Sequence, residues 1–192
     1  MVQSINHQEA NANYKAKKFI IWLFVVSSTI MFAGWTSYYI VFAASKSKGH
    51  GLVLPDMFLY STGVLLVSSI CLFLAARAFR NGELAKQKTF LWATLLLGVV
   101  FGYLQVEAWV SLYQSGAFLV NNNAAISIIY IVSGIHLLHI LAGLLLILST
   151  LLGAYGKIAT ERLQFRMEVS SIFWHFIDIL WIYLYVFLLL NS

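Results

Sequence analysis

The sequence predicts an all-α integral membrane protein, a bundle of five transmembrane helices with no separate soluble domain. Of its 192 residues 61% are hydrophobic and only 10% are charged, whereas a soluble domain carries about 25% charged residues. The apolar residues fall into five runs. Each run exceeds the ~20 residues that cross a hydrocarbon core of ~30 Å, so the length of the chain leaves room only for short connections.

The expected helices form a single membrane domain, 19–192, behind a polar tail, 1–18. Their ranges are 19–44, 55–80, 88–113, 124–155 and 165–190. The first run is too long for the apolar core of a signal peptide, and no small-residue cleavage site follows it at the right distance. We therefore expect this run to be the first transmembrane helix.

Residues typical of helix ends bound the later runs. Pro55 and Asp56 open the second run, because proline is tolerated in a first turn and a carboxylate suits the N-terminal dipole. Arg80 followed by Asn81 and Gly82 is a stop signal at its end. The third run follows Lys86 and Lys88, the fourth follows three asparagines at 121–123, and the fifth begins with Arg166 and Glu168.

Lysine and arginine residues predict the orientation of the bundle. Two of the twelve cations, Lys46 and Lys48, lie on one side of the expected spans. The other ten lie on the opposite side: Lys15, Lys17, Lys18, Arg77, Arg80, Lys86, Lys88, Lys157, Arg162 and Arg166. The positive-inside rule therefore predicts a cytoplasmic N-terminus and an external C-terminus. Because these cations flank membrane segments, the net charge of +5 does not indicate a nucleic-acid partner.

Ionisable residues inside the apolar runs are the candidates for function. His136 and His139 lie in the run 124–155, and His175 and Asp178 lie in the run 165–190. Residues three or four apart share one face of a helix. A charged residue at the membrane centre costs roughly 2.5–3.5 kcal/mol, so Asp178 needs a partner. The two pairs have similar estimated depths, so we expect that partner to be a histidine of 124–155 or His175.

These residues leave three interpretations open. Three imidazoles and one carboxylate are a plausible ligand set for zinc or iron, which would make the chain a small membrane haem or metal protein. However, a di-iron bundle needs four Glu and two His. Asp178 and the histidines could instead form the proton relay of a proton-coupled transporter. The third interpretation is a structural polar cluster. Cys71 is the only cysteine, which excludes a disulfide framework and a cysteine-based metal site.

Two motifs resemble subunit III of haem-copper oxidases. The run Ser133-Gly134-Ile135-His136-Leu137-Leu138-His139, with Gly143, is similar to the S/T-G-x-H-x-x-H-x-x-x-G run of that family. Glu168 followed by Phe173-Trp174-His175-Phe176-Ile177-Asp178-Ile179-Leu180-Trp181-Ile182-Tyr183-Leu184-Tyr185 is similar to its E…Y/F-W-H-F-x-D-x-x-W-x-x-L-Y signature. Weaker matches extend the resemblance over residues 19–190, to the short, five-helix form.

The resemblance implies a subunit of a proton-pumping haem-copper (cytochrome c) oxidase in the bacterial cytoplasmic membrane. Subunit III would hold no cofactor, with haems and copper in partner subunits. It would pack on oxidase subunit I among the other subunits. Its first two helices would splay from the other three around structural phospholipids, and it would support stability and proton uptake. The electron donor, the haem types, membership of a supercomplex and a nitric-oxide reductase accessory role stay open.

The resemblance also assigns the polar residues to a structural or lipid-binding cluster. Its members are His136, His139, Glu168, Trp174, His175, Asp178 and Trp181, and none is catalytic, cofactor-binding or metal-ligating. Two positions depart from the family pattern. Ser28 stands where many members have a buried glutamate after a serine, so the role of that carboxylate is not carried over. Glu107 comes one position earlier than the family glutamate, about 100° round the helix.

Overall fold

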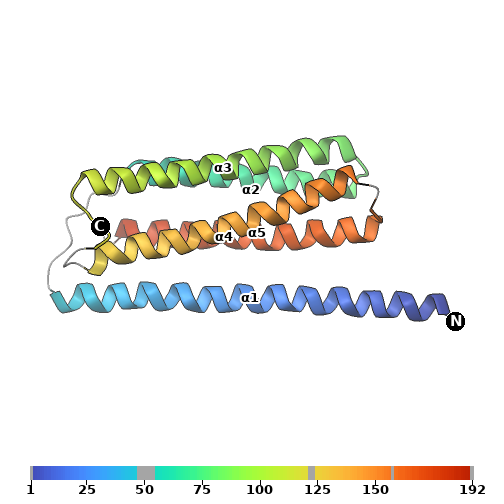
Figure 1. Ribbon diagram of the computed structural model, residues 1–192, viewed down its shortest axis with the longest axis horizontal. Helices are drawn as coiled ribbons and strands as arrows, with labels where there is room; N and C mark the ends of the chain where they lie inside the picture. The colour runs from blue at the N-terminus through green and yellow to red at the C-terminus, as the bar shows by residue number, and fades with distance from the viewer. Residues whose placement is uncertain (1, 47–54, 121–123, 157, 191–192) are drawn as a thin grey trace.

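A computed structural model describes residues 2–46, 55–120, 124–156 and 158–190. It forms a bundle of five helices (Figure 1). These are α1 Val2–Lys46, α2 Met57–Arg80, α3 Leu84–Gln114, α4 Ala124–Tyr155 and α5 Thr160–Leu190. Each helix contains a segment long and apolar enough to cross a membrane, so the predicted all-α membrane fold is confirmed.

Three helices begin earlier than the hydrophobic runs indicate. α1 continues back through the expected polar tail to Val2, α3 starts at Leu84 instead of 88, and α5 starts at Thr160 instead of 165. The segment 2–18 contains no proline or glycine and is rich in helix-forming Ala, Gln and Lys. A helix that already exists extends without a new nucleation step. The apolar run therefore marks the membrane-crossing part of each helix, not the helix ends.

The helices lie in three layers, with α1 on one side, α4 and α5 in the middle, and α2 and α3 on the other side (Figure 1). α2 packs mainly against α3 and also against α5, whereas α1 packs against α4 and α5. The three-residue connection 81–83, with Gly82 at φ 74°, turns the chain tightly and makes α2 and α3 antiparallel neighbours.

The expected splaying of the first two helices away from the other three is wrong. α1 and α2 make no contact in the described part of the chain, and each is attached to α5. Their connection, 47–56, is longer than the α2–α3 turn, so nothing forces them to be neighbours. The bundle is therefore divided differently, with α5 as the helix that α1, α2 and α4 share.

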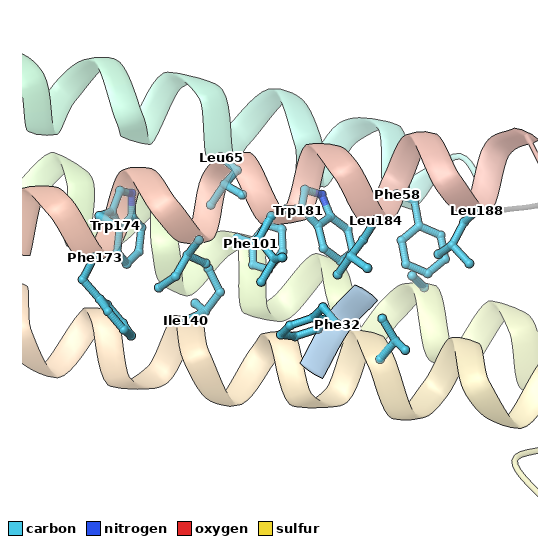
Figure 2. Packing of buried hydrophobic residues seen from close by; sticks show 14 of the residues in the cluster. Phe32, Phe58, Leu65, Phe101, Ile140, Phe173, Trp174, Trp181, Leu184 and Leu188 are labelled. Atoms are coloured by element: carbon cyan, nitrogen blue, oxygen red, sulfur yellow. The ribbon is translucent and has the colours of Figure 1, made fainter. Parts of the chain in front are cut away.

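α5 is the most enclosed helix. In its apolar segment 44% of the residues are buried, compared with 17% in α1. Trp174 and Trp181 project from α5 into the core beside Ile140 and Phe101 (Figure 2). The apolar run of α5 thus contributes its polar and aromatic residues to the interior, whereas α1 keeps a wide apolar face on the outside.

The N-terminus and the α2–α3 and α4–α5 connections lie at one end of the bundle, and the C-terminal end of α5 lies at the other (Figure 1). The end with the N-terminus and these two connections carries nine of the ten cations that the sequence places together, and the tenth, Lys157, lies outside the described residues. The assignment of this end to the cytoplasm stays a prediction. We call it the basic end.

Candidate functional site

Trp174 joins α5 to α3 and α4 through two glycines. Its side chain is fully buried. A Cβ atom placed on Gly98 of α3 would lie 2.8 Å from Trp174 Cη2, and one on Gly143 of α4 would lie 2.9 Å from Cε3. Real Cβ contacts are not this short, so the indole fits between the helices only because both positions lack a side chain.

Trp181 and His136 form the aromatic centre of the bundle. Their rings stack at 4.9 Å between centroids, and Phe101 of α3 meets the edges of both, at 5.1 and 5.8 Å. Trp181 Nε1 donates a hydrogen bond of 3.0 Å to Thr62 Oγ1 of α2. His136 is completely buried, and its two ring nitrogens have no hydrogen-bond partner among the described residues. This histidine therefore packs as an aromatic ring.

His139, one turn further along α4, is directed toward α1. Its Nδ1 lies 2.8 Å from the Ile135 carbonyl oxygen, and its Nε2 lies 3.2 Å from Ser28 Oγ. A carbonyl only accepts, so Nδ1 donates the first of these hydrogen bonds, and Nε2 and the Ser28 hydroxyl form the second. Ser28, the position at which the family pattern has a carboxylate, thus contacts the second histidine of the motif on α4.

His175 and Asp178 face α2 instead. Ser69 Oγ lies 2.7 Å from His175 Nδ1. The same nitrogen is 3.8 Å from Asp178 Oδ2, which is an ion-pair distance but too long for a hydrogen bond. Asp178 is 3% exposed, and both of its carboxylate oxygens lack a hydrogen-bond partner among the described residues. Of the two partners expected for Asp178, the structure places His175 beside it.

Glu168 lies at the basic end of α5, two turns from His175. It forms an ion pair with Lys18 of α1. Gln164 Nε2, one turn earlier on α5, donates a hydrogen bond of 2.9 Å to Glu168 Oε1. Lys18, the last residue of the expected polar tail 1–18, therefore helps to attach α1 to α5.

The seven expected site residues do not form one cluster between α4 and α5. Instead, His139 contacts α1, His175 and Asp178 face α2, and Glu168 meets α1 at the end of the bundle. Residues three apart differ by about 60° around a helix axis. His136 and His139 can therefore have different neighbours on one enclosed helix, because α4 is in contact with α1, α3 and α5.

The three intramembrane histidines are not arranged as a ligand set. His136 stacks on Trp181, His139 bonds to Ser28 and His175 bonds to Ser69, so the three imidazole rings lie in three separate surroundings. Across the described residues, no group of three His, Cys, Asp or Glu side chains is placed to hold a metal ion.

Several hydrogen bonds between helices involve residues that were not among the expected site residues. Thr36 Oγ1 lies 2.7 Å from Tyr183 Oη between α1 and α5, and Thr150 Oγ1 lies 2.8 Å from Ser170 Oγ between α4 and α5. Trp109 Nε1 donates a hydrogen bond of 3.0 Å to Ser133 Oγ between α3 and α4. Serine and threonine within apolar runs are a usable signal for such contacts, because membrane helices associate through small and hydroxyl side chains.

Comparison with known proteins assigns the family. A family model described as cytochrome c oxidase subunit III matches residues 3–192. The chain belongs to the cytochrome c oxidase subunit III family. Both motifs of this family noted in the sequence lie in α4 and α5, the two helices that carry the contacts described above.

Relatives in the family include subunits of two kinds of oxidase. Subunit 3 of cytochrome bo(3) ubiquinol oxidase from Buchnera aphidicola subsp. Acyrthosiphon pisum is 31% identical, over 92% of this chain and 87% of the relative. The same subunit from Pseudomonas aeruginosa is 29% identical, over 92% and 86%. Cytochrome c oxidase subunit 3 from Osphranter robustus is 28% identical, and the chain covers 65% of its length.

The spans and the relatives together indicate where the protein resides. All five helices can cross a membrane, and bacterial members of the family match over nearly their whole length. The chain is a multi-pass protein of the bacterial inner membrane.

Proposed function

We propose that this chain is subunit III of a haem-copper oxidase that reduces oxygen in the aerobic respiratory chain and pumps protons. In this role it carries no redox centre, and the haems and copper belong to partner subunits. It packs on oxidase subunit I, binds phospholipid, and sustains proton uptake by the complex. The observation that carries the proposal is the family match over residues 3–192.

The geometry of the polar residues supports a non-catalytic role. Ser28–His139, Ser69–His175 and Lys18–Glu168 each connect two different helices. Contacts of this kind hold a bundle together, and none of them leaves a set of imidazoles converging on one point. The expected metal-protein and transporter alternatives gain no support from this arrangement.

The electron donor is a property of the partner subunits in this proposal. The relatives named ubiquinol oxidase subunit 3 and those named cytochrome c oxidase subunit 3 both match this chain. The former match over 87% of their length and the latter over 65%. A quinol-oxidising complex is therefore the first one to assay.

The test is the lifetime of the oxidase during turnover, measured with and without this chain. We expect the complex purified from a deletion strain to begin turnover at a normal rate and to lose activity sooner than the wild-type complex. Restoration of the chain from a plasmid should restore the lifetime. An oxidase with the same rate and the same lifetime in both strains would contradict the proposal.

A further inference from the structure

One carboxylate lies on the outside of the bundle within a membrane-crossing segment. Among the described residues, the charged side chains of the five spans lie within three turns of each span's basic end, except for Glu107 and Asp178. Asp178 is buried beside His175. Glu107 is only half-buried, at the surface of α3, and α3 belongs to the layer farthest from α1 (Figure 1). The carboxylate of Glu107 is therefore directed away from the core.

The position of Glu107 along α3 places its carboxylate within the hydrocarbon. α3 extends from Leu84 to Gln114, so Glu107 lies eight residues beyond the midpoint at residue 99. At 1.5 Å per residue this is about 12 Å, less than the ~15 Å half-thickness of the hydrocarbon core when the helix is centred on the membrane. Ionisable side chains at such depths pair with one another or face a protein interior or a wet cavity. Glu107 thus needs a partner.

The described part of the chain offers Glu107 a partner only on its own helix. Tyr103 Oη, one turn earlier on α3, donates a hydrogen bond of 2.8 Å to Glu107 Oε1. Tyr103 is itself exposed. Among the described residues Glu107 Oε2 makes no hydrogen bond or ion pair. The phenol therefore orients the carboxylate, and the second oxygen remains available to a donor from outside the chain.

Glu107 belongs to a row of residues with the spacing of a helix-packing seam. Its members alternate four and three residues apart, which is the spacing at which one helix packs along another. The row consists of Leu96, Val100, Tyr103, Glu107 and Val110. Its four uncharged members are exposed. A single polar position in such a seam specifies the register and the partner, so the row is suited to one transmembrane helix in one register.

The charge of Glu107 determines which helix can pack on this row. Copies of this chain have the same orientation in a membrane, so a symmetric pair packed through the row would place two Glu107 carboxylates at the same depth. Like charges repel strongly where the dielectric constant is low. A lysine or arginine within the hydrocarbon also needs a partner of opposite charge. A helix of another subunit with such a cation therefore complements Glu107, whereas a second copy does not.

We propose that this row of α3 binds a transmembrane helix of a partner subunit, and that a lysine or arginine of that helix pairs with Glu107. Tyr103 holds the carboxylate in position for the pair. The proposal rests on the proposed function, because the partner is a subunit of the same oxidase complex. It specifies the face of the bundle and the residue through which the chain joins that complex.

The test measures how long this subunit stays in the purified oxidase. Complexes with the wild-type chain, Glu107→Gln or Asp56→Asn are diluted into detergent, and the released subunit is separated by size at timed intervals. Glu107→Gln keeps the shape of the side chain and removes its charge. Asp56→Asn is the matched control, because Asp56 is an exposed carboxylate just before α2, at the same end of the bundle and outside the row.

We expect Glu107→Gln to be released about tenfold faster than the wild-type chain, which corresponds to ~1.4 kcal/mol, because the loss of one partner of a buried charge pair acts mainly on the dissociation rate. Asp56→Asn should be released at the wild-type rate. Equal release of all three proteins would overturn the proposal. So would an equal increase in both variants, because it would indicate a general effect of charge at this end.

The stability of the isolated chain separates this contact from a role in folding. Glu107→Gln should unfold at the wild-type midpoint in detergent, because Glu107 bonds only to Tyr103 within the described chain. A lower midpoint for Glu107→Gln would place the partner of Glu107 within this chain and would overturn the proposal.

Photo-crosslinking in the native complex identifies the occupant of the row. A photoreactive residue at position 100 should label one transmembrane helix of another subunit, with a lysine or arginine at the depth of Glu107. Leu138 is exposed near the midpoint of α4, as Val100 is near the midpoint of α3, and a photoreactive residue at position 138 should not label that helix. Labelling of phospholipid alone, or of a second copy of this chain, would overturn the proposal.

Exchange of the two charges completes the test. Glu107→Lys alone should be released faster than the wild-type chain, and the wild-type rate should return when the labelled cation of the partner is changed to glutamate. Failure of this exchange to slow the release would overturn the pairing. If the wild-type chain does not co-purify with a haem subunit, the proposed function is contradicted. Unchanged release of Glu107→Gln from an intact oxidase contradicts only this inference.

Discussion

Trp174 shows how a single side chain determines which residues its neighbours can be. The indole lies against Gly98 and Gly143, and an added Cβ would approach it to less than 3 Å at either position. Gly98 and Gly102 are both glycines in a pattern typical of close helix packing. Only the structure distinguishes them, because a Cβ on Gly102 would meet Leu137 at an ordinary 3.7 Å.

We expect Gly98→Ala to destabilise the bundle by about 1–3 kcal/mol, the range for overpacking a filled core. The added methyl group collides with Leu144 at 2.6 Å as well as with Trp174. Gly102→Ala is the matched control and should have little effect. The measurement is the unfolding midpoint in detergent, and equal midpoints for the two variants would contradict the packing described here.

For Asp178 the sequence predicted a histidine partner, either in the run 124–155 or His175. Of its two expected partners, His175 lies beside it, with Nδ1 3.8 Å from Asp178 Oδ2. We expect Asp178→Ala to weaken the attachment of α5 to α2 by about 1–3 kcal/mol, because it removes the carboxylate beside the Ser69–His175 contact and opens a buried space. In the purified oxidase, less of this subunit should remain per subunit I.

Asp178→Asn is the control for this variant, because it keeps the shape of the side chain and removes only the charge. We expect it to retain more of the subunit than Asp178→Ala does. A complex of Asp178→Ala with full stoichiometry and a normal turnover lifetime would show that Asp178 is not needed for the contact between α5 and α2.

α1 is attached to the rest of the bundle at successive depths. Lys18–Glu168, Ser28–His139 and Thr36–Tyr183 are separated by ten and eight residues along the helix. At 1.5 Å per residue they lie about 15 and 12 Å apart. Because most of the apolar segment of α1 is exposed, these polar contacts have more influence on its position than they would in an enclosed helix.

We expect Ser28→Ala to weaken the docking of α1 by roughly 0.6 kcal/mol and at most ~1.7 kcal/mol, the range for such bonds in membrane proteins. The loss should disappear in a His139→Ala background, because the two side chains form one contact. Ser27→Ala, at an exposed neighbouring position, is the control. Equal effects of Ser28→Ala in both backgrounds would contradict the Ser28–His139 bond.

The elements could be predicted from the hydrophobic runs, but their partners could not. All five ranges overlap the observed helices, and the α2–α3 turn follows from Arg80, Asn81 and Gly82. The direction of each polar residue depends on which helices surround it. α5 touches α1, α2 and α4, so His175 and Glu168 meet different helices although both belong to one signature.

The whole molecule has one basic end, and this predicts its orientation. We expect Asn81→Cys, in the α2–α3 turn, to react with a membrane-impermeant maleimide only from the cytoplasm. Phe118→Cys, an exposed residue after α3 at the opposite end, should react only from outside. Both are made with Cys71→Ser. The reverse pattern in intact cells would contradict the orientation predicted from the ten cations.

The packing of the helices against one another could not be predicted from the sequence, for a physical reason. Splaying of the first two helices requires them to be in contact with each other. The hydropathy pattern does not indicate whether two helices joined by a ten-residue connection pack together. In the structure Lys18, Ser28 and Thr36 all point to α4 or α5. The family resemblance identified the subunit type correctly, but the packing of α1 follows from these side chains.

The measurement that tests the account most directly is affinity purification of this chain from native membranes in mild detergent, followed by a reduced-minus-oxidised spectrum. The account predicts haem bands together with a large haem-copper subunit I, and loss of both when α5 is disrupted. Haem bands from the chain without a partner would mean that its histidines ligate a cofactor. The absence of both haem and partner would contradict the assignment of this chain to an oxidase.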